Sequence, residues 1–232
     1  MAIESLTEQL NQLKDDILLM GKMVSNAIEM AVDALKRQDM ELAVQVAMND
    51  ENIDQLQLDI EGRCLSLLAL QQPVGRDLRF IGTALKIIID LERMGDHASN
   101  IAKVVLSIGN EPLIKPLIDI PLMADLIHTM IRQNLKAYVN QDRDKALKTA
   151  LLDNSINAYF TKVFNELQEL MAKDPKNIKQ AVFLLFIARY LERIGDHATN
   201  LSEMIVYTIT GERLELKEGR VETKLFTNAE EV

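Results

Sequence analysis

A pair of carboxylates at helical spacing occurs once in each half of this sequence. Glu92 and Asp96 are four residues apart, as are Glu192 and Asp196. At about 100° per residue, residues four apart project from one face of a helix. Carboxylates that meet a second helix need compensation, because buried charge is tolerated only when it is paired, protonated or bound to metal. The spacing therefore predicts a metal site in each half.

The pairs belong to a repeated decapeptide. LERMGDHASN at residues 91–100 returns as LERIGDHATN at residues 191–200, with only two positions changed. Apolar residues upstream share the angular stripe of each acidic pair, so both pairs are expected to face a partner helix. These residues are Leu78, Ile81, Leu85 and Ile88 in the first copy and Ile178, Ala181, Leu185 and Ala188 in the second. The chain is thus predicted to be a duplicated helical protein.

A further set of residues lies in the expected middle helix of each half, where the segments DENID and DNSIN align. Asp50 and Asp54 share one helix face, as do Asp153 and Asn157. An antiparallel third helix would bring these residues opposite the repeated pairs. Four oxygen-bearing side chains without His or Cys form a hard site suited to magnesium, manganese, calcium or iron, and to zinc where carboxylates bridge ions. Such a charge density favours a multinuclear centre.

The same residues have a plainer interpretation. Asp50, Asp54 and Asp153 could be solvated helix residues, and Glu92 could pair with a nearby Arg or Lys, as most helix charges do. A single carboxylate pair would favour that interpretation. Four pairs in duplicated register favour the metal site.

Other residues of the repeat have assignable roles. Asn100 and Asn200 extend each motif by one turn, where their amides are expected to orient or ligate a carboxylate. His97 and His197 lie about 140° around the helix from their glutamates, so we expect them in another seam or at the surface. Arg93 is expected to bridge to an acidic neighbour such as Asp90 at i,i+3 spacing.

The glycines of the repeat, Gly95 and Gly195, lie within predicted helices, where Gly costs roughly 1 kcal/mol relative to Ala. This cost predicts close approach of another helix, or of ligand-bearing atoms, beside each Asp.

Composition limits the protein class. Hydrophobic residues make up 48% of the 232 residues but aromatic residues only 4%, which is typical of a helical bundle. The net charge of −9 and the lack of a Lys/Arg cluster argue against nucleic acid as a partner. The single cysteine, Cys64, excludes an intramolecular disulfide and is expected in the core.

No targeting or membrane segment is evident. The first twenty residues carry acidic residues among their apolar positions, unlike a secretory signal. The longest apolar runs, such as residues 181–188, are far shorter than the roughly 20 residues of a spanning helix. We therefore expect a cytoplasmic protein whose association with a membrane is at most peripheral.

The predicted architecture is all-α, with two tandem, similar three-helix bundles of six long antiparallel helices. Pro112, Pro116 and Pro121 mark a linker, and Asp142 and Asp174 are expected helix N-caps. The expected domains are a first bundle at 1–110, a Pro-rich linker at 111–121, a second bundle at 122–210 and a polar tail at 211–232. The expected helices span residues 4–36, 39–71, 76–108, 122–140, 143–172 and 175–208.

With the repeat, the lead-in PVGRDLRFIGTALKI and the DENID element, the chain resembles the PhoU family over residues 4–208. The resemblance implies two three-helix bundles and a cytoplasmic regulator, not an enzyme, that suppresses the phosphate-starvation response when phosphate is plentiful. It also implies coupling between the ATPase subunit of the phosphate ABC transporter and a membrane-bound sensor histidine kinase. Some members hold multinuclear iron or zinc clusters, and a homodimer is expected.

The family's acid pattern gives the expected metal ligands and cofactors. Asn157 departs from this pattern, so we expect the second site to bind metal more weakly or to hold fewer ions. The cofactors implied are iron, zinc, manganese or magnesium ions. The pattern falls on Asp50, Asp54, Glu92 and Asp96 in the first half and on Asp153, Glu192 and Asp196 in the second.

Several mechanisms stay open from the sequence. Bound cations would pin the second and third helices together and present a fixed acidic surface, or they would themselves recruit phosphate. Two other kinds of protein also fit the sequence: a carboxylate-bridged metalloenzyme and a metal-free helical scaffold. Catalysis has little support. A ferritin-like di-iron oxidase needs two Glu-X-X-His elements, and the nearest match in this sequence is the single Asp-X-X-His segment from Asp125 to His128.

Overall fold

The computed structural model describes residues 5–216, and all regular elements in this range are helical. The predicted all-α class is confirmed. Residues 217–232, most of the predicted polar tail, lie outside the described range. In chain order the elements are α1 (Leu6–Arg37), α2 (Met40–Gln71), α3 (Gly75–Ile108), α4 (Asp119–Asn140), α5 (Arg143–Ala150), α6 (Asp153–Lys173), the 3-10 turn η1 (Pro175–Asn177) and α7 (Ile178–Thr210).

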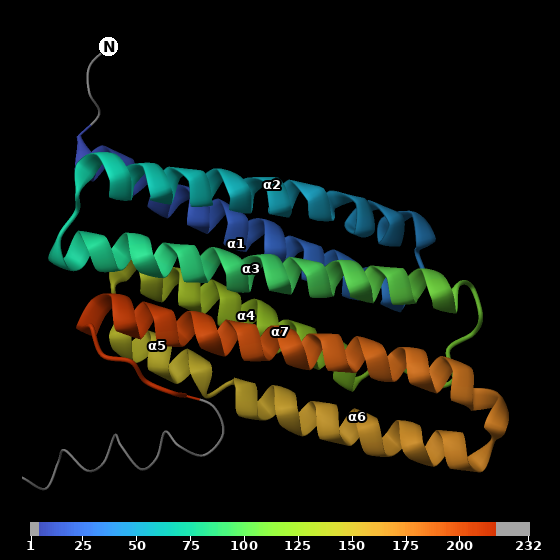
Figure 1. The fold of residues 1–232 in the computed structure, drawn as a ribbon. Helices are drawn as coiled ribbons and strands as arrows, with labels where there is room; N and C mark the ends of the chain where they lie inside the picture. Colours follow the sequence, from blue (N-terminus) through green and yellow to red (C-terminus); the bar gives the residue numbers. More distant parts are fainter. Residues whose placement is uncertain (1–4, 217–232) are drawn as a thin grey trace, which may run out of the picture.

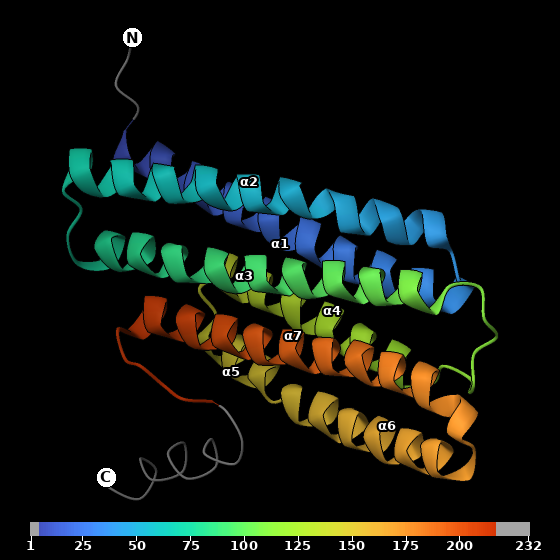
Figure 2. The same cartoon turned by 45° about the vertical axis from the view of Figure 1, so that its right-hand side comes forward.

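The helices form two bundles that pack side by side (Figure 1). Helices α1, α2 and α3 make the first bundle, and α4 to α7 make the second. The equivalent helices α3 and α7 lie next to each other at the centre, while α2 and α6 lie at opposite outer edges (Figure 2). Helix α1 also contacts α4. The repeated decapeptides, which lie on α3 and α7, therefore face each other across the junction of the halves.

Acidic caps start several of these helices where the sequence predicts them. The Asp142 side chain accepts a hydrogen bond from the Lys145 backbone N–H at the start of α5. Asp174 does the same for Lys176, with Pro175 at the first position of η1. Each cap satisfies a backbone donor that has no partner within its own helix. Both predicted N-caps are confirmed.

Aliphatic side chains fill the core, and half of the stripe residues named above lie in it. Ile81, Ile88, Ala181 and Ala188 are buried. Leu78 and Ile178 lie in the first turns of their helices, where nearly half of each side chain is exposed.

Cys64 is buried in the core, as predicted. Burial raises the pKa of its thiol to about 12. The side chain therefore behaves as a small apolar core residue, because the reactive form of cysteine is the thiolate.

The predicted helix at residues 143–172 is broken in two, which corrects the expected plan of six continuous helices. Helix α5 ends at Ala150 and α6 begins at Asp153, with Leu151 and Leu152 forming the turn between them. The backbone N–H of Leu152 bonds to Thr149 O at 3.1 Å, a tightened i→i+3 contact. Helix α5 packs against both α4 and α7, and α6 continues from the turn along a displaced path (Figure 1). Tertiary packing has overridden the helix preference of this segment.

Helix α4 begins at Asp119, so the segment between the helices of the two halves spans residues 109–118. Pro121 lies in the first turn of α4, where its missing N–H costs no helical hydrogen bond. Asp119 is only 3% exposed and pairs with Lys162 Nζ of α6 at 2.8 Å. Within residues 5–216, no helix has an apolar stretch long enough to cross a membrane.

Candidate functional site

Helices α2 and α3 bring together the first set of predicted ligands, which we call site 1: Asp50, Asp54, Glu92 and Asp96. Asp50, Asp54 and Asp96 each place one carboxylate oxygen within 4.8 Å of the others. Among the described residues, this is the only group of three or more His, Cys, Asp or Glu residues close enough to hold a metal ion. The i,i+4 spacing on two antiparallel helices thus produces the convergence that it predicts.

Burial and mutual repulsion make site 1 electrostatically costly. Burial raises the pKa of Asp50, Asp54 and Glu92, and the negative charge of Asp96 raises each of these pKa values further. Asp54 Oδ1 is buried and has no hydrogen-bond partner in the described part of the chain. Both conditions fit a cation-binding site, because a bound cation would compensate the charges and supply the missing partner.

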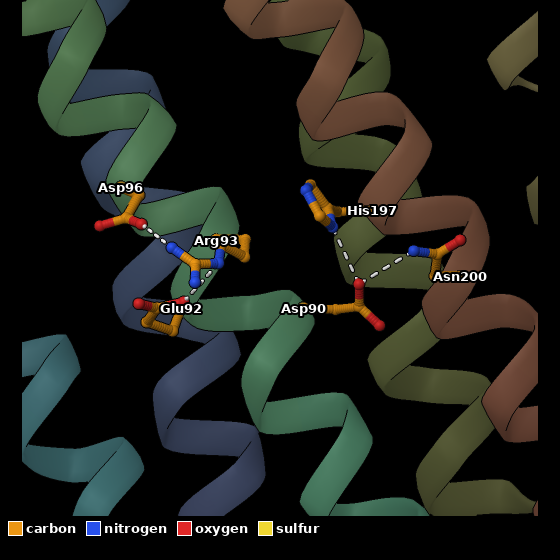
Figure 3. A network of polar contacts seen from close by, with 6 residues as sticks. All are labelled: Asp90, Glu92, Arg93, Asp96, His197 and Asn200. Carbon is orange, nitrogen blue, oxygen red and sulfur yellow. Dashed lines mark hydrogen bonds and ion pairs between the residues drawn. The ribbon is translucent and has the colours of Figure 1, made fainter.

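Arg93 forms ion pairs with two carboxylates of site 1 (Figure 3). Its Nη1 lies 2.9 Å from Asp96 Oδ2, and its Nε lies 3.4 Å from Glu92 Oε2. The predicted bridge from Arg93 to an acidic neighbour at i,i+3 spacing is therefore confirmed, but the partner is Asp96 and not Asp90. Because the Arg93 side chain is 56% exposed, the ion pairs are of the weak surface kind. A metal ion could displace this guanidinium at modest cost.

The equivalent residues between α6 and α7 form site 2: Asp153, Asn157, Glu192 and Asp196. Here Asn157 Nδ2 donates to Asp153 Oδ2 at 3.2 Å, so the amide occupies a carboxylate oxygen. Burial raises the pKa of Glu192, while the charge of Arg189 opposes that increase. Glu192 Oε2 is buried without a hydrogen-bond partner among residues 5–216. Site 2 has three carboxylates instead of four, and its own polar groups already engage two of them.

Arg189 is the residue of site 2 that the sequence interpretation missed. Its Nη1 lies 2.6 Å from Glu192 Oε1, and its guanidinium lies 5.7 Å from the centre of the Phe160 ring. The i,i+3 spacing of Arg189 and Glu192 was the available indication, but such pairs are common on helices. Site 1 has no equivalent, because Ile89 occupies the corresponding position on α3.

The two glycines of the repeat sit where the second helix of each half approaches most closely. A Cβ on Gly195 would lie 2.7 Å from Asp153 Oδ1 and 3.1 Å from Ile156 Cδ1. A Cβ on Gly95 would lie 3.1 Å from Ile53 Cδ1 and 3.7 Å from Asp50 Oδ1. The predicted close approach beside each Asp is confirmed.

The histidines of the repeat lie in the seam between α3 and α7, as predicted, and not in the acidic sites. The rings of His97 and His197 have their centres 5.7 Å apart. His197 Nδ1 lies 2.8 Å from Asp90 Oδ1, which links the two halves (Figure 3). Tyr190, the counterpart of Asp90, instead stacks on His97 with 5.6 Å between ring centres. Burial, followed by the charge of His197, lowers the pKa of His97 to about 4.

The asparagines of the repeat do not behave as a matched pair. Asn200 Nδ2 donates to Asp90 Oδ1 at 3.0 Å, so its amide reaches the other half of the molecule instead of the carboxylates of site 2. Asn100 makes no hydrogen bond within the described range. A ligand role for Asn100 stays a prediction.

The model of the PhoU domain matches the chain twice, over residues 17–105 and 120–205. The chain belongs to the PhoU family. The two matches coincide with the two helical bundles, and each contains one acidic site.

Relatives and solved structures extend this similarity over most of the chain. A "phosphate-specific transport system accessory protein PhoU homolog" from Clostridium acetobutylicum is 38% identical over 210 residues, which cover 90% of this chain and 96% of the relative. A protein of the same name from Aquifex aeolicus is 39% identical over 207 residues, which cover 89% of this chain and 94% of the relative.

The fold also matches crystal structures of PhoU. The protein from Pseudomonas aeruginosa has a TM-score of 0.86 and 32% identity, with coverage of 90% of this chain and all of that chain. The "phosphate transport system regulatory protein PhoU" from Streptococcus pneumoniae has a TM-score of 0.86 and 34% identity, covering 91% and 100%. These names describe accessory and regulatory proteins, not enzymes.

Proposed function

We propose that this chain is a metal-binding, non-catalytic regulator of phosphate uptake that limits the phosphate-starvation response when phosphate is plentiful. Two lines of argument support the proposal. The relatives that share about nine-tenths of the chain are named as accessory proteins of phosphate-specific transport. Site 1 gathers three carboxylates within 4.8 Å of one another and has few internal counterions.

The metal would be held by Asp50, Asp54, Glu92 and Asp96 in site 1, and more weakly by Asp153, Glu192 and Asp196 in site 2. Iron, zinc, manganese or magnesium would suit these oxygen ligands, and clusters of more than one ion would balance the charge of site 1. A bound cation would supply charge neutralisation. The bound cation would then hold α2 and α3 at a fixed distance from each other at the surface of the first bundle.

The proposed partners are the ATPase subunit of the phosphate ABC transporter and the phosphate-sensing histidine kinase. Binding to these partners would place the protein at the cytoplasmic face of the membrane, and the protein is proposed to act as a homodimer. The partner assignments rest on the family resemblance. The fixed acidic surface described above is the part of the molecule that we assign to signalling the phosphate state.

Elemental analysis of untagged protein tests metal binding. We expect metal in the wild-type protein, a large loss in Glu92→Ala and a smaller loss in Glu192→Ala. Glu61→Ala, which removes an exposed carboxylate elsewhere on α2, is the control and should retain the wild-type metal content. Equal metal content in all four proteins would contradict the assignment of the metal to sites 1 and 2, and absence of metal from the wild-type protein would favour a metal-free scaffold.

Gene deletion tests the regulatory role separately. Deletion should derepress phosphate-scavenging functions in cells grown with abundant phosphate, and the wild-type gene should restore repression. Isotherms for phosphate with and without bound metal would then distinguish direct recruitment of phosphate from a purely structural role of the metal. Normal repression in the deletion strain would overturn the regulatory assignment.

A further inference from the structure

A groove runs between α1 and α4, the two helices that join the bundles away from the acidic sites. One part of the groove is a cavity of about 480 Å³ with an apolar floor formed by Leu18, Ile131, Leu135 and Val139. The lining residues of α1 recur at three- and four-residue spacing, so they form a continuous edge along the helix. None of the residues that line this cavity belongs to site 1 or site 2.

The floor of the groove is held by direct contacts between the two helices. A Cβ on Gly21 would lie 2.8 Å from Leu135 Cδ2, so the glycine lets α4 approach α1 closely. Ser25 Oγ lies 2.8 Å from His128 Nδ1, and Lys14 Nζ donates to Val139 O at 2.9 Å. These contacts tie the helices together at both ends of the cavity. The groove is therefore preformed.

Three exposed cations, Lys22, Arg132 and Lys136, line the same cavity. The structure gives none of them an ion pair or hydrogen bond within residues 5–216. The chain as a whole carries a net charge of −9, so three uncompensated cations around one apolar floor are a local departure from its acidic surface. They would attract a partner that combines apolar side chains with carboxylates.

The groove continues past His128 with the opposite charge. A second hollow of about 160 Å³ shares His128 with the first and is lined by Ile28 and Val32. Glu29 and Asp125 stand exposed in its lining without an ion-pair partner in the described range, and the Lys36 that also lines it is paired with Asp33 at 3.0 Å. The groove is therefore basic at one end and acidic at the other, with apolar residues along its length.

We propose that the groove between α1 and α4 binds an amphipathic helix of a protein partner. The partner's acidic end lies over Lys22, Arg132 and Lys136, and its basic end lies over Glu29 and Asp125. The residues of α4 that line the two hollows run from Pro121 to Asn140, a span of about 28 Å at 1.5 Å per residue, which corresponds to about five helical turns. Helices commonly bind in grooves of this kind through an apolar stripe.

Charge distribution favours a helix over other occupants. An acyl chain with an anionic head, or an anionic membrane, would be attracted to the basic end but repelled by Glu29 and Asp125. A helix with acidic residues in one half and basic residues in the other matches both ends at once. The proposal is independent of metal binding, so failure of either one leaves the other standing.

Synthetic peptides of about 20 residues test the inference with the full chain. One peptide has a Leu/Ala stripe, with glutamates in one half and lysines in the other, and a control peptide has the same composition with the charges intermixed. The divided peptide should bind more than about tenfold more tightly than the intermixed one and gain helical circular dichroism signal on binding. Equal affinity for both peptides, or no binding, would overturn the proposal.

Charge reversal locates the binding site. The variant K22E/K136E should weaken binding of the divided peptide by more than about tenfold. The variant K86E/K148E changes the net charge equally at exposed lysines outside the groove and should bind as the wild type does. Equal loss in both variants would overturn the assignment to the groove.

Two further measurements address the other occupants. Phosphatidylglycerol vesicles that bind the wild type but not K22E/K136E, without binding of the divided peptide, would overturn the proposal in favour of a membrane. A wild-type dimer that K22E/K136E dissociates in sedimentation would overturn it in favour of a second copy of the chain. Absence of both effects, together with peptide binding, supports the partner helix.

Discussion

Site 1 and site 2 occupy equivalent places in the two bundles but differ in how their charges are compensated. In site 1, Asp50 lies in the middle of the unbroken helix α2, whereas its counterpart Asp153 is the first residue of α6. Site 1 depends on Arg93, which is exposed, while site 2 depends on Arg189 and on the amide of Asn157. Duplication has preserved the position of most of the acidic residues, and substitution around them has changed which side chains of the protein compensate their charge.

The largest expected change in metal affinity comes from converting site 2 into a copy of site 1. Asn157→Asp restores the fourth carboxylate, and Arg189→Ile removes the competing guanidinium and copies residue 89. Manganese binding at site 2 is compared in a protein whose site 1 is disabled by D54N/E92Q. In that background, adding N157D/R189I should tighten manganese binding at site 2 by at least about tenfold, or about 1.4 kcal/mol. Calorimetric titration of metal-free protein measures the change.

The control for this conversion is Asn165→Asp, which adds a carboxylate on the exposed face of α6. It should leave manganese affinity at site 2 within about twofold of its starting value. If the unaltered protein already binds manganese equally at both sites, the contrast between site 1 and site 2 is wrong.

The second effect concerns the junction of the halves, where Asp90 and Tyr190 occupy equivalent positions. Asp90→Ala should cost about 2 kcal/mol of unfolding free energy, because His197 and Asn200 both lose a partly buried partner. Tyr190→Phe keeps the ring that stacks on His97 and should change stability by less than about 0.5 kcal/mol. Urea denaturation in the presence of chelator compares the two, and equal losses would refute this asymmetry.

The third effect comes from the glycines of the repeat. Gly195→Ala should destabilise the protein by about 1–2 kcal/mol, because its methyl group would meet Asp153 Oδ1 at 2.7 Å. Gly95→Ala meets the flexible end of Ile53 at 3.1 Å, and its gain in helix propensity of about 1 kcal/mol offsets much of that contact. Denaturant midpoints of both variants measure the difference. Greater destabilisation by Gly95→Ala would reverse the predicted order.

The smallest effect is the pH dependence of the metal-free protein. Burial and the charge of Asp96 raise the pKa of Asp54 in the folded state. The ionised Asp54 carboxylate therefore destabilises the folded protein fully at neutral pH. This destabilisation is relieved as pH falls through the folded-state pKa toward the ordinary value of about 4. Asp54→Asn should therefore raise the melting temperature by about 2–4 °C at pH 7 and by less at pH 5.

His97 acts in the opposite direction, because its pKa of about 4 lies below the ordinary value and its protonation opposes folding as pH falls below 6.5. This contribution is common to the wild type and Asp54→Asn, so it cancels in the difference between their melting temperatures. A difference that grows on acidification would contradict the assignment of a raised pKa to Asp54.

Local sequence rules account for much of the fold and for the composition of site 1. Helical periodicity and caps such as Asp142 and Asp174 locate most helices to within a few residues. The spacing of Glu92 and Asp96, set against Asp50 and Asp54, predicts that these side chains converge. Each pair depends on residues four apart, whose relation follows from helix geometry alone, and the opposition of the two pairs follows from the antiparallel packing of neighbouring helices.

Features that depend on distant residues could not be predicted in the same way. The break at Leu151 and Leu152 follows from the packing of α5 against α4 and α7, although both residues favour a helix. The partners of Asp90 lie on a helix more than 100 residues away in sequence, so its i,i+3 neighbour Arg93 was the wrong choice. Where two possible partners compete, the tertiary arrangement decides.

The meeting of α3 with α7 has a consequence for how such a molecule can diversify. In a symmetric homodimer, every substitution at the two-fold interface occurs on both sides at once. Joining the two copies in one polypeptide removes that restriction, so one side can keep an acid at position 90 while the other carries an aromatic ring at position 190. Covalent fusion thus allows the two sides of the junction to carry different side chains with different contacts.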